Sequence, residues 1–282
     1  MKLVSLPSGR SVPALGQGTW RMGENHAQRQ AEVAALRLGL DLGMTLIDTA
    51  EMYGEGGAEK VVGEAIAGRR DEVFLVSKVY PHNATRQGVV DACDRSLKRL
   101  QAESLDLYLL HWRGAVPLAE TLAGLQSLKQ VGKIQSYGVS NFDRNDMEEA
   151  IALPGGDEIV TNQVLYNLMN RGIEWDLLPW SRDRNIPTMA YSPIGHSPAE
   201  QKSLFRNSQL KAIADRHEAT PTQVALAWLL HQEGIIAIPK ATNPAHIQEN
   251  RAALELTFST LDLTELDRIF PPPRRKTALA MR

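Results

Sequence analysis

The chain alternates short apolar segments with longer amphipathic segments along almost its whole length. Short apolar runs are typical of strands buried on both faces, and apolar residues at helical spacing between them are typical of covering helices. The predicted strands are residues 14–18, 45–48, 73–78, 105–111, 136–140, 159–165, 188–191 and 235–239. The predicted helices are residues 28–42, 58–67, 85–100, 117–131, 144–153, 172–184, 222–232 and 244–253. A strand–helix unit repeated in this way favours an α/β fold, the (β/α)8 TIM barrel.

A turn at Pro7, Ser8 and Gly9 predicts a β-hairpin before the first barrel strand. The rival fold is a pair of doubly wound domains, but no low-complexity linker divides the chain and no G-x-G-x-x-G follows a predicted strand. We therefore expect one barrel domain over residues 1–282.

Charge and apolar content restrict the partners. The chain has 31 basic and 33 acidic residues without a long block of one sign, which argues against nucleic acid. No apolar stretch of about 18 residues is present to span a membrane, and the first residues lack a signal-peptide pattern. The single cysteine, Cys93, falls on an apolar helix face and is interpreted as a core thiol. These features predict a cytoplasmic protein that acts on a small molecule.

Ionisable and polar side chains follow three consecutive predicted strands. Asp48 ends the second strand with Tyr53 just beyond it, Lys78 ends the third and His111 ends the fourth. Alone, each has a structural interpretation: a helix cap, a packed phenol, a solvated amine or a hydrogen-bonded core imidazole. Because catalytic groups of such barrels lie at the carboxyl ends of the strands, the four together favour an active site.

Their chemistry is that of carbonyl reduction. A phenol has a pKa of about 10 and is a weak acid, but a nearby ammonium lowers that pKa. Lys78 can supply the ammonium, and Asp48 can keep it charged in an apolar barrel mouth. A neutral His111 can polarise a carbonyl oxygen while Tyr53 donates the proton, with hydride supplied by another group.

The sequence resembles the aldo-keto reductase family through almost its whole length. The matching motifs, in the family's order, are GQGTW at 16–20, IDTAEMYG at 47–54, LVSKV at 75–79, LDLYLLHW at 105–112, GVSN at 138–141, NQV at 162–164, AYSPIG at 190–195, and IPKA with QEN between 238 and 250. The similarity is greatest to the short bacterial branch that includes methylglyoxal-reducing enzymes. It implies that Tyr53 is the proton donor, tuned by Lys78 and Asp48, with His111 at the substrate carbonyl.

The resemblance also implies a nicotinamide nucleotide at the barrel mouth. Its carboxamide would be held by Ser140, Asn141 and Gln163, and its ring would stack on Tyr191. The other cofactor residues implied are Gly18, Thr19, Trp20, Asp48, Ser192, Pro193, Ile194, Gly195, Lys240, Ala241, Thr242, His246, Glu249 and Asn250. Lys240 matches the family's partner for the 2′-phosphate, so NADPH is the expected cofactor.

Two residues depart from the family pattern at this end of the cofactor. The family usually has a serine directly after that lysine and an arginine six residues after it, where this chain has Ala241 and His246. A neutral imidazole does not replace the charged fork of arginine. We therefore expect weaker discrimination between NADPH and NADH than is usual in the family, so that NADH can also serve as cofactor.

Aromatic residues beyond the first, third and fourth strands are the expected walls of the substrate pocket: Trp20, Tyr80 and Trp112, beside His111. The segment 196–208 and the tail after Phe270 are expected to be short and irregular, which would leave the pocket open. We expect a monomer that reduces small aldehydes and α-dicarbonyls, with methylglyoxal implied by the resemblance.

Three alternatives remain at this point. One is a sugar or keto-acid reductase, and another is a binding module similar to the nicotinamide-sensing accessory subunits of ion channels, in which turnover is secondary. A metal-dependent barrel enzyme is disfavoured, because His111 is the only histidine at a predicted strand end, and no metal is expected.

Overall fold

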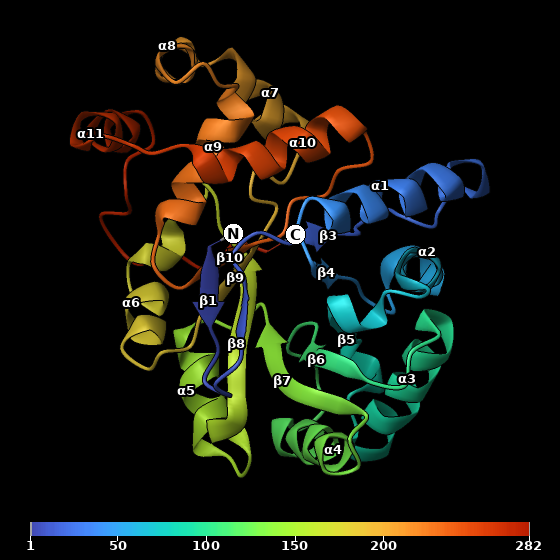
Figure 1. Ribbon diagram of the computed structural model, residues 1–282. Helices are drawn as coiled ribbons and strands as arrows, with labels where there is room; N and C mark the ends of the chain where they lie inside the picture. The colour runs from blue at the N-terminus through green and yellow to red at the C-terminus, as the bar shows by residue number, and fades with distance from the viewer. Residues whose placement is uncertain (1, 282) are drawn as a thin grey trace.

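Eight parallel strands form one sheet in which each strand pairs with the next along the chain. The computed structural model describes residues 2–281 (Figure 1). The strands are β3 (Gln17–Gly18), β4 (Leu46–Asp48), β5 (Phe74–Val79), β6 (Leu105–Leu110), β7 (Ile134–Ser140), β8 (Ile159–Leu165), β9 (Thr188–Tyr191) and β10 (Ile235–Ala237). Leu15 bridges Ala237 in parallel and the Gly18 amide donates to the Pro239 carbonyl at 3.0 Å. The sheet therefore closes on itself, and the predicted α/β barrel is confirmed.

Helices form the layer outside the strands (Figure 1). Those that follow successive strands are α1 (Arg29–Asp41), α2 (Gly57–Ile66), α3 (Arg86–Leu100), α4 (Leu118–Gln130), α5 (Arg144–Ala152), α6 (Leu177–Arg182), α9 (Pro221–His231) and α10 (Pro244–Ala252). The predicted helix 85–100 begins as expected, because the Thr85 hydroxyl accepts a hydrogen bond from the Gly88 amide. The predicted helix 172–184 is broken into a 3-10 turn, Gly172–Glu174, and the short α6.

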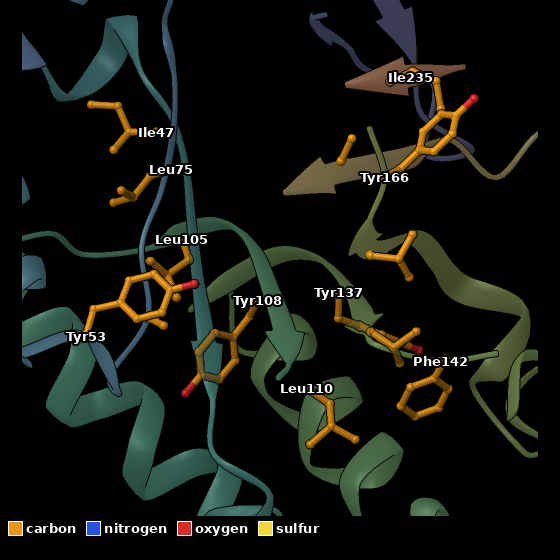
Figure 2. Packing of buried hydrophobic residues seen from close by; sticks show 14 of the residues in the cluster. Ile47, Tyr53, Leu75, Leu105, Tyr108, Leu110, Tyr137, Phe142, Tyr166 and Ile235 are labelled. Carbon is orange, nitrogen blue, oxygen red and sulfur yellow. The ribbon is translucent and has the colours of Figure 1, made fainter. Parts of the chain in front are cut away.

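The apolar side chains of the strands belong to two clusters, one inside the barrel and one between the strands and the helices. Ile47 and Leu75 belong to the cluster that packs against the helices, part of which is shown in Figure 2. Their chain neighbours Leu46 and Val76 belong to a second cluster. This split follows from the alternation of side chains along a strand.

The N-terminal hairpin packs on the second cluster. It consists of β1 (Leu3–Ser5) and β2 (Ser11–Pro13), which pair antiparallel. Val4 and Val12 are buried and share this cluster with barrel residues such as Leu107. The predicted hairpin is confirmed, and its apolar face extends the barrel interior.

The expectation that residues 196–208 are irregular is wrong. Most of them form the helix α7 (Pro198–Arg206), which is followed by α8 (Ser208–Arg216), and both helices lie outside α9 (Figure 1). The Ser197 hydroxyl accepts from the Glu200 amide and Pro198 occupies the first turn, so the proline that suggested a loop begins a helix. A further helix, α11 (Thr260–Ile269), begins at a capping box of Ser259 and Asp262.

Two further predictions, the irregular tail and the buried cysteine, are confirmed. The tail after Phe270 has neither helix nor strand over 271–281. Cys93 is fully buried in α3, where burial raises the pKa of its thiol to about 12. Within residues 2–281, every helix is too short or too polar to cross a membrane.

Candidate active site

Neighbouring strands bring the four predicted catalytic residues to one end of the barrel. Asp48 is the last residue of β4, Lys78 lies in β5 and His111 follows β6 directly, with its amide bonded to the Val79 carbonyl at 3.0 Å. Because these strands are parallel and adjacent, their carboxyl ends lie at the same edge.

A tight turn carries Tyr53 back over the strand ends. Tyr53 begins the 3-10 segment η2 (Tyr53–Gly56), in which Gly54, Glu55 and Gly56 have φ values of 56°, 54° and 84°. Left-handed backbone is accessible to glycine without steric cost, which accounts for two glycines in the three positions. The glycine-rich stretch therefore allows the chain to turn directly after the buried strand.

The ammonium of Lys78 joins the acid and the phenol. Its Nζ lies 2.7 Å from Asp48 Oδ2, 2.8 Å from the Thr49 carbonyl and 3.2 Å from the Tyr53 hydroxyl. Three partners use all three donors of an ammonium group. Burial lowers the pKa of Lys78, while Asp48 opposes this shift by stabilising the charged form. The Lys78 side chain is 0% exposed, so bulk water does not screen these contacts.

The second oxygen of Asp48 is held by an amide. Gln163 Nε2 donates to Asp48 Oδ1 at 2.8 Å and also lies 2.9 Å from Met189 Sδ. The Asp48 carbonyl accepts from the Thr19 hydroxyl at 3.0 Å. Asp48 is therefore fixed from β8 and from the end of β3 as well as by Lys78.

His111 is buried and uncharged. Burial, with a smaller contribution from the positive charge of Lys78, lowers its pKa from 6.5 to about 2. Within residues 2–281, its Nδ1 has no hydrogen-bond partner. Its ring centroid lies 5.7 Å from that of Tyr53, edge to face. A neutral imidazole beside the phenol can donate a hydrogen bond without competing as an acid.

The three aromatic residues predicted as pocket walls lie near these groups. The centroids of Trp20 and Tyr53 are 5.0 Å apart, and Tyr80 lies 5.6 Å from Trp112 and 6.4 Å from His111. Trp20, Tyr80 and Trp112 are all partly exposed. They therefore line the open side of the cluster.

A second polar group lies on the ends of β7, β8 and β9. Ser140 Oγ donates to the Gln163 carbonyl at 2.8 Å, and the Tyr191 hydroxyl donates to Asn141 Oδ1 at 2.9 Å. Asn141 Nδ2 donates to the His111 carbonyl at 3.1 Å. The four residues assigned by resemblance to a nicotinamide thus form one connected network, which is joined to the four predicted catalytic residues through His111 and Gln163.

The loop after β9 is a compact turn. The Gly195 amide donates to the Ser192 carbonyl at 3.0 Å, with Pro193 and Ile194 between them. Asn167 Nδ2 donates to the same carbonyl at 2.9 Å. Asn167 was not predicted, because it lies after the end of its strand in a segment without a recognised motif.

The residues expected at the adenosine end follow β10. Lys240, Ala241 and Thr242 succeed that strand, whereas His246, Glu249 and Asn250 lie on α10. Lys240 and His246 are exposed and Asn250 is buried. Among residues 2–281, no carboxylate forms an ion pair with Lys240.

Gly18 is required for the closure of the barrel at this point. A Cβ on Gly18 would lie 2.7 Å from the Ile238 carbonyl oxygen, closer than side chains tolerate. The missing side chain allows β3 to approach the end of β10, so Thr19 and Trp20 are brought to the side of the barrel mouth where Lys240 lies.

Comparison with known proteins identifies the family. Residues 14–270 match the model of the aldo/keto reductase family. The chain belongs to this family. It is 52% identical over 280 residues to methylglyoxal reductase YeaE of Escherichia coli, covering 99% of both chains, and 32% identical to aldo-keto reductase YhdN of Bacillus subtilis, covering 90% and 88%.

Solved structures agree with this identification. An aldo/keto reductase of Klebsiella pneumoniae in complex with NADP and acetate has a TM-score of 0.97 and 49% identity, and covers 100% of this chain and 99% of its own. A second structure from the same organism, in complex with NADPH, has the same TM-score and 50% identity. This aldo/keto reductase is therefore an oxidoreductase.

Two contacts in the site of this reductase were not predicted from the sequence. The Thr49 carbonyl accepts from Lys78, and the Met189 sulfur contacts Gln163. Every residue has a backbone carbonyl, so the sequence does not show which one accepts a hydrogen bond. A methionine in an apolar strand looks like any other core residue. Only the geometry of the closed barrel shows these two partners.

Proposed function

We propose that this protein reduces small aldehydes and α-dicarbonyl compounds to alcohols with NADPH, and that methylglyoxal is a substrate. The observation that carries the proposal is Lys78, whose buried ammonium contacts Asp48 at 2.7 Å and Tyr53 at 3.2 Å beside a neutral His111. The 52% identity to a methylglyoxal reductase over nearly the whole chain supports the substrate class. We further propose that residues 1–282 act as a single domain in a cytoplasmic monomer.

The residues at the barrel mouth fit a phosphorylated nicotinamide nucleotide. Ser140, Asn141 and Gln163 offer hydroxyl and amide groups beside the Tyr191 ring, as recognition of a carboxamide requires. Lys240 is an exposed cation without a carboxylate partner among the described residues, so it can pair with a phosphate. Because residue 246 is histidine and not arginine, only one of the family's two cations for the 2′-phosphate, Lys240, is present in this sequence.

When bound, the nicotinamide supplies a hydride to the carbonyl carbon. Tyr53 donates its phenolic proton to the carbonyl oxygen as negative charge develops there. The Lys78 ammonium stabilises the phenolate that remains, and Asp48 keeps that ammonium charged.

His111 acts as a hydrogen-bond donor at the same oxygen. Its pKa of about 2 keeps the ring neutral at neutral pH. A proton on Nε2 leaves the buried Nδ1 as an acceptor, which avoids an unpaired N–H in an apolar place. His111 therefore orients the carbonyl, and the transferred proton comes from Tyr53.

The pocket walls suit a small substrate. Trp20, Tyr80 and Trp112 offer flat apolar faces around the phenol and the imidazole. Such a wall excludes water from the reacting oxygen while its few polar groups fix the substrate orientation.

The test is consumption of NADPH or NADH by the purified protein with methylglyoxal, followed by nicotinamide absorbance. Faster consumption with NADPH than with NADH is expected, and the product should be the corresponding hydroxy-carbonyl compound. Cofactor binding without consumption, on methylglyoxal and on a panel of other aldehydes and ketones, would overturn the reductase assignment and favour a nicotinamide-binding module.

A further inference from the structure

Glu51 is a buried carboxylate between two turns of the site. It lies between Asp48 and Tyr53 in the chain, and its side chain is only 7% exposed. Its Oε1 accepts from the Tyr80 backbone amide at 2.8 Å and from Asn83 Nδ2 at 3.0 Å. Its Oε2 lies 3.7 Å from the guanidinium of Arg95. The cost of burying the carboxylate is therefore offset by two hydrogen bonds and one cation.

The segment after β4 and the strand β5 are joined first by backbone hydrogen bonds and then by the Glu51 side chain. The Thr49 amide donates to the Val76 carbonyl at 2.9 Å, and the Glu51 amide reaches the Lys78 carbonyl at 3.4 Å. After Glu51, the segment that follows β4 turns away from β5 into η2. The Tyr80 amide therefore has no backbone acceptor there and bonds to the Glu51 carboxylate.

This bond holds the turn that carries the Tyr80 ring. Tyr80 precedes the 3-10 segment η4 (Pro81–Asn83), and Glu51 bonds both Tyr80 and Asn83. The Tyr80 ring packs on Trp112 and lies beside His111. One carboxylate thus connects the turn that presents the phenol to the turn that presents a pocket wall.

We propose that Glu51 is a positioning residue for substrate binding, which fixes the turn at 80–83 through two hydrogen bonds and so holds the Tyr80 ring at the pocket wall. This inference rests on the proposed reductase function. It assigns no contact between Glu51 and the substrate, the cofactor or the reacting atoms.

The test compares Glu51→Ala with Glu51→Gln. Glu51→Ala leaves the Tyr80 amide and the Asn83 amide without an acceptor, so the KM for methylglyoxal should rise about tenfold while kcat changes by less than about threefold. The dissociation constant of NADPH should not change. The side-chain amide oxygen introduced by Glu51→Gln can accept the same two bonds, so this variant should keep the KM within about twofold of wild type.

Ser77→Ala is the matched control. Ser77 lies in the same strand as Lys78 and donates at 2.6 Å to Glu59, another buried carboxylate, on the helix side of the barrel. Its loss should lower the melting temperature slightly and leave the KM unchanged. Should Glu51→Ala fail to fold, Asn83→Ala removes one of the two bonds alone and should raise the KM about threefold.

Amide hydrogen exchange supplies a readout that does not depend on turnover. The Tyr80 amide should be protected in wild type and Glu51→Gln and should exchange faster in Glu51→Ala. An unchanged KM in Glu51→Ala, or a Glu51→Gln variant as defective as Glu51→Ala, would overturn the inference alone. A rise in KM accompanied by equally large decreases in kcat and in NADPH affinity would also overturn it, since such changes indicate general destabilisation. A wild-type protein that reduces no carbonyl would instead overturn the proposed function.

Discussion

The Lys78 ammonium nitrogen lies 3.2 Å from the Tyr53 hydroxyl oxygen, in a place where the lysine side chain has no exposed surface. Bulk water does not screen this contact, so the charge of Lys78 acts on the phenol more strongly than it would at the protein surface. The same burial makes the ammonium dependent on Asp48, because an unpaired charge in this place is costly. In the proposed mechanism, catalysis and stability are therefore linked through the Lys78 side chain.

Replacing Lys78 by methionine is expected to affect both properties. Lys78→Met removes the cation beside the phenol and leaves the Asp48 carboxylate buried without its ion-pair partner, which should destabilise the fold by about 3–5 kcal/mol. The kcat should fall at least about 100-fold. Denaturant unfolding and steady-state kinetics measure the two effects.

The double variant Asp48→Asn with Lys78→Met separates these effects. It removes both charges, so most of the lost stability should return while kcat stays low. A double variant that regained activity together with stability would contradict the role of Lys78 at the phenol.

His111 should make stability depend on pH. Its folded-state pKa is about 2 and its ordinary value is 6.5, so between these values the unfolded chain binds a proton that the folded protein does not. Folding stability should therefore fall as the pH is lowered below 6.5, by up to about 1.4 kcal/mol for each pH unit from this group.

The variant His111→Asn should lose this part of the pH slope. The measurement is urea unfolding from about pH 4 to pH 8, with the wild type and the variant compared at each pH. Equal slopes for the two proteins would show that His111 is charged in the folded state or ionises alike in both states.

Cofactor choice should respond to position 246. His246 is exposed on the first turn of α10, in the segment that follows Lys240, and a charged guanidinium there can join Lys240 in binding a phosphate. His246→Arg is expected to tighten NADPH binding about tenfold, because charge-assisted hydrogen bonds are stronger than neutral ones.

NADH is the internal control for this variant, since it lacks the 2′-phosphate and its affinity should not change. Fluorescence titration with each nucleotide gives both dissociation constants. Equal tightening of NADPH and NADH would place the new charge near a phosphate that the two cofactors share.

The sequence predicted the barrel because its strand–helix alternation and its strand-end residues depend on local patterns. Asp48, Tyr53, Lys78 and His111 come together because adjacent parallel strands end at one edge, which follows from the chain order of the strands. Helix α7 is not among the predicted elements, although Ser197, Pro198 and Glu200 carry the signals of a helix start. Prolines and basic residues are also typical of irregular segments, and the local pattern does not separate the two.

Contacts between residues far apart in the chain depend on how the barrel closes. Glu51 looks like one more acidic residue in a turn, yet its carboxylate bonds groups that are 29 and 32 positions away in the chain. Likewise Gln163 reaches Asp48 across 115 positions. Such contacts are set by strand register and barrel size, and no local pattern predicts them.

The role of Tyr53 as proton donor is tested by a single-turnover measurement on Tyr53→Phe with NADPH bound and methylglyoxal added. The variant keeps the ring that packs against Trp20 and His111 but lacks the hydroxyl. NADPH should bind as in wild type, and the rate of its oxidation should fall at least about 100-fold, the contribution expected of a general acid. Oxidation at the wild-type rate would contradict the assignment of Tyr53 as proton donor.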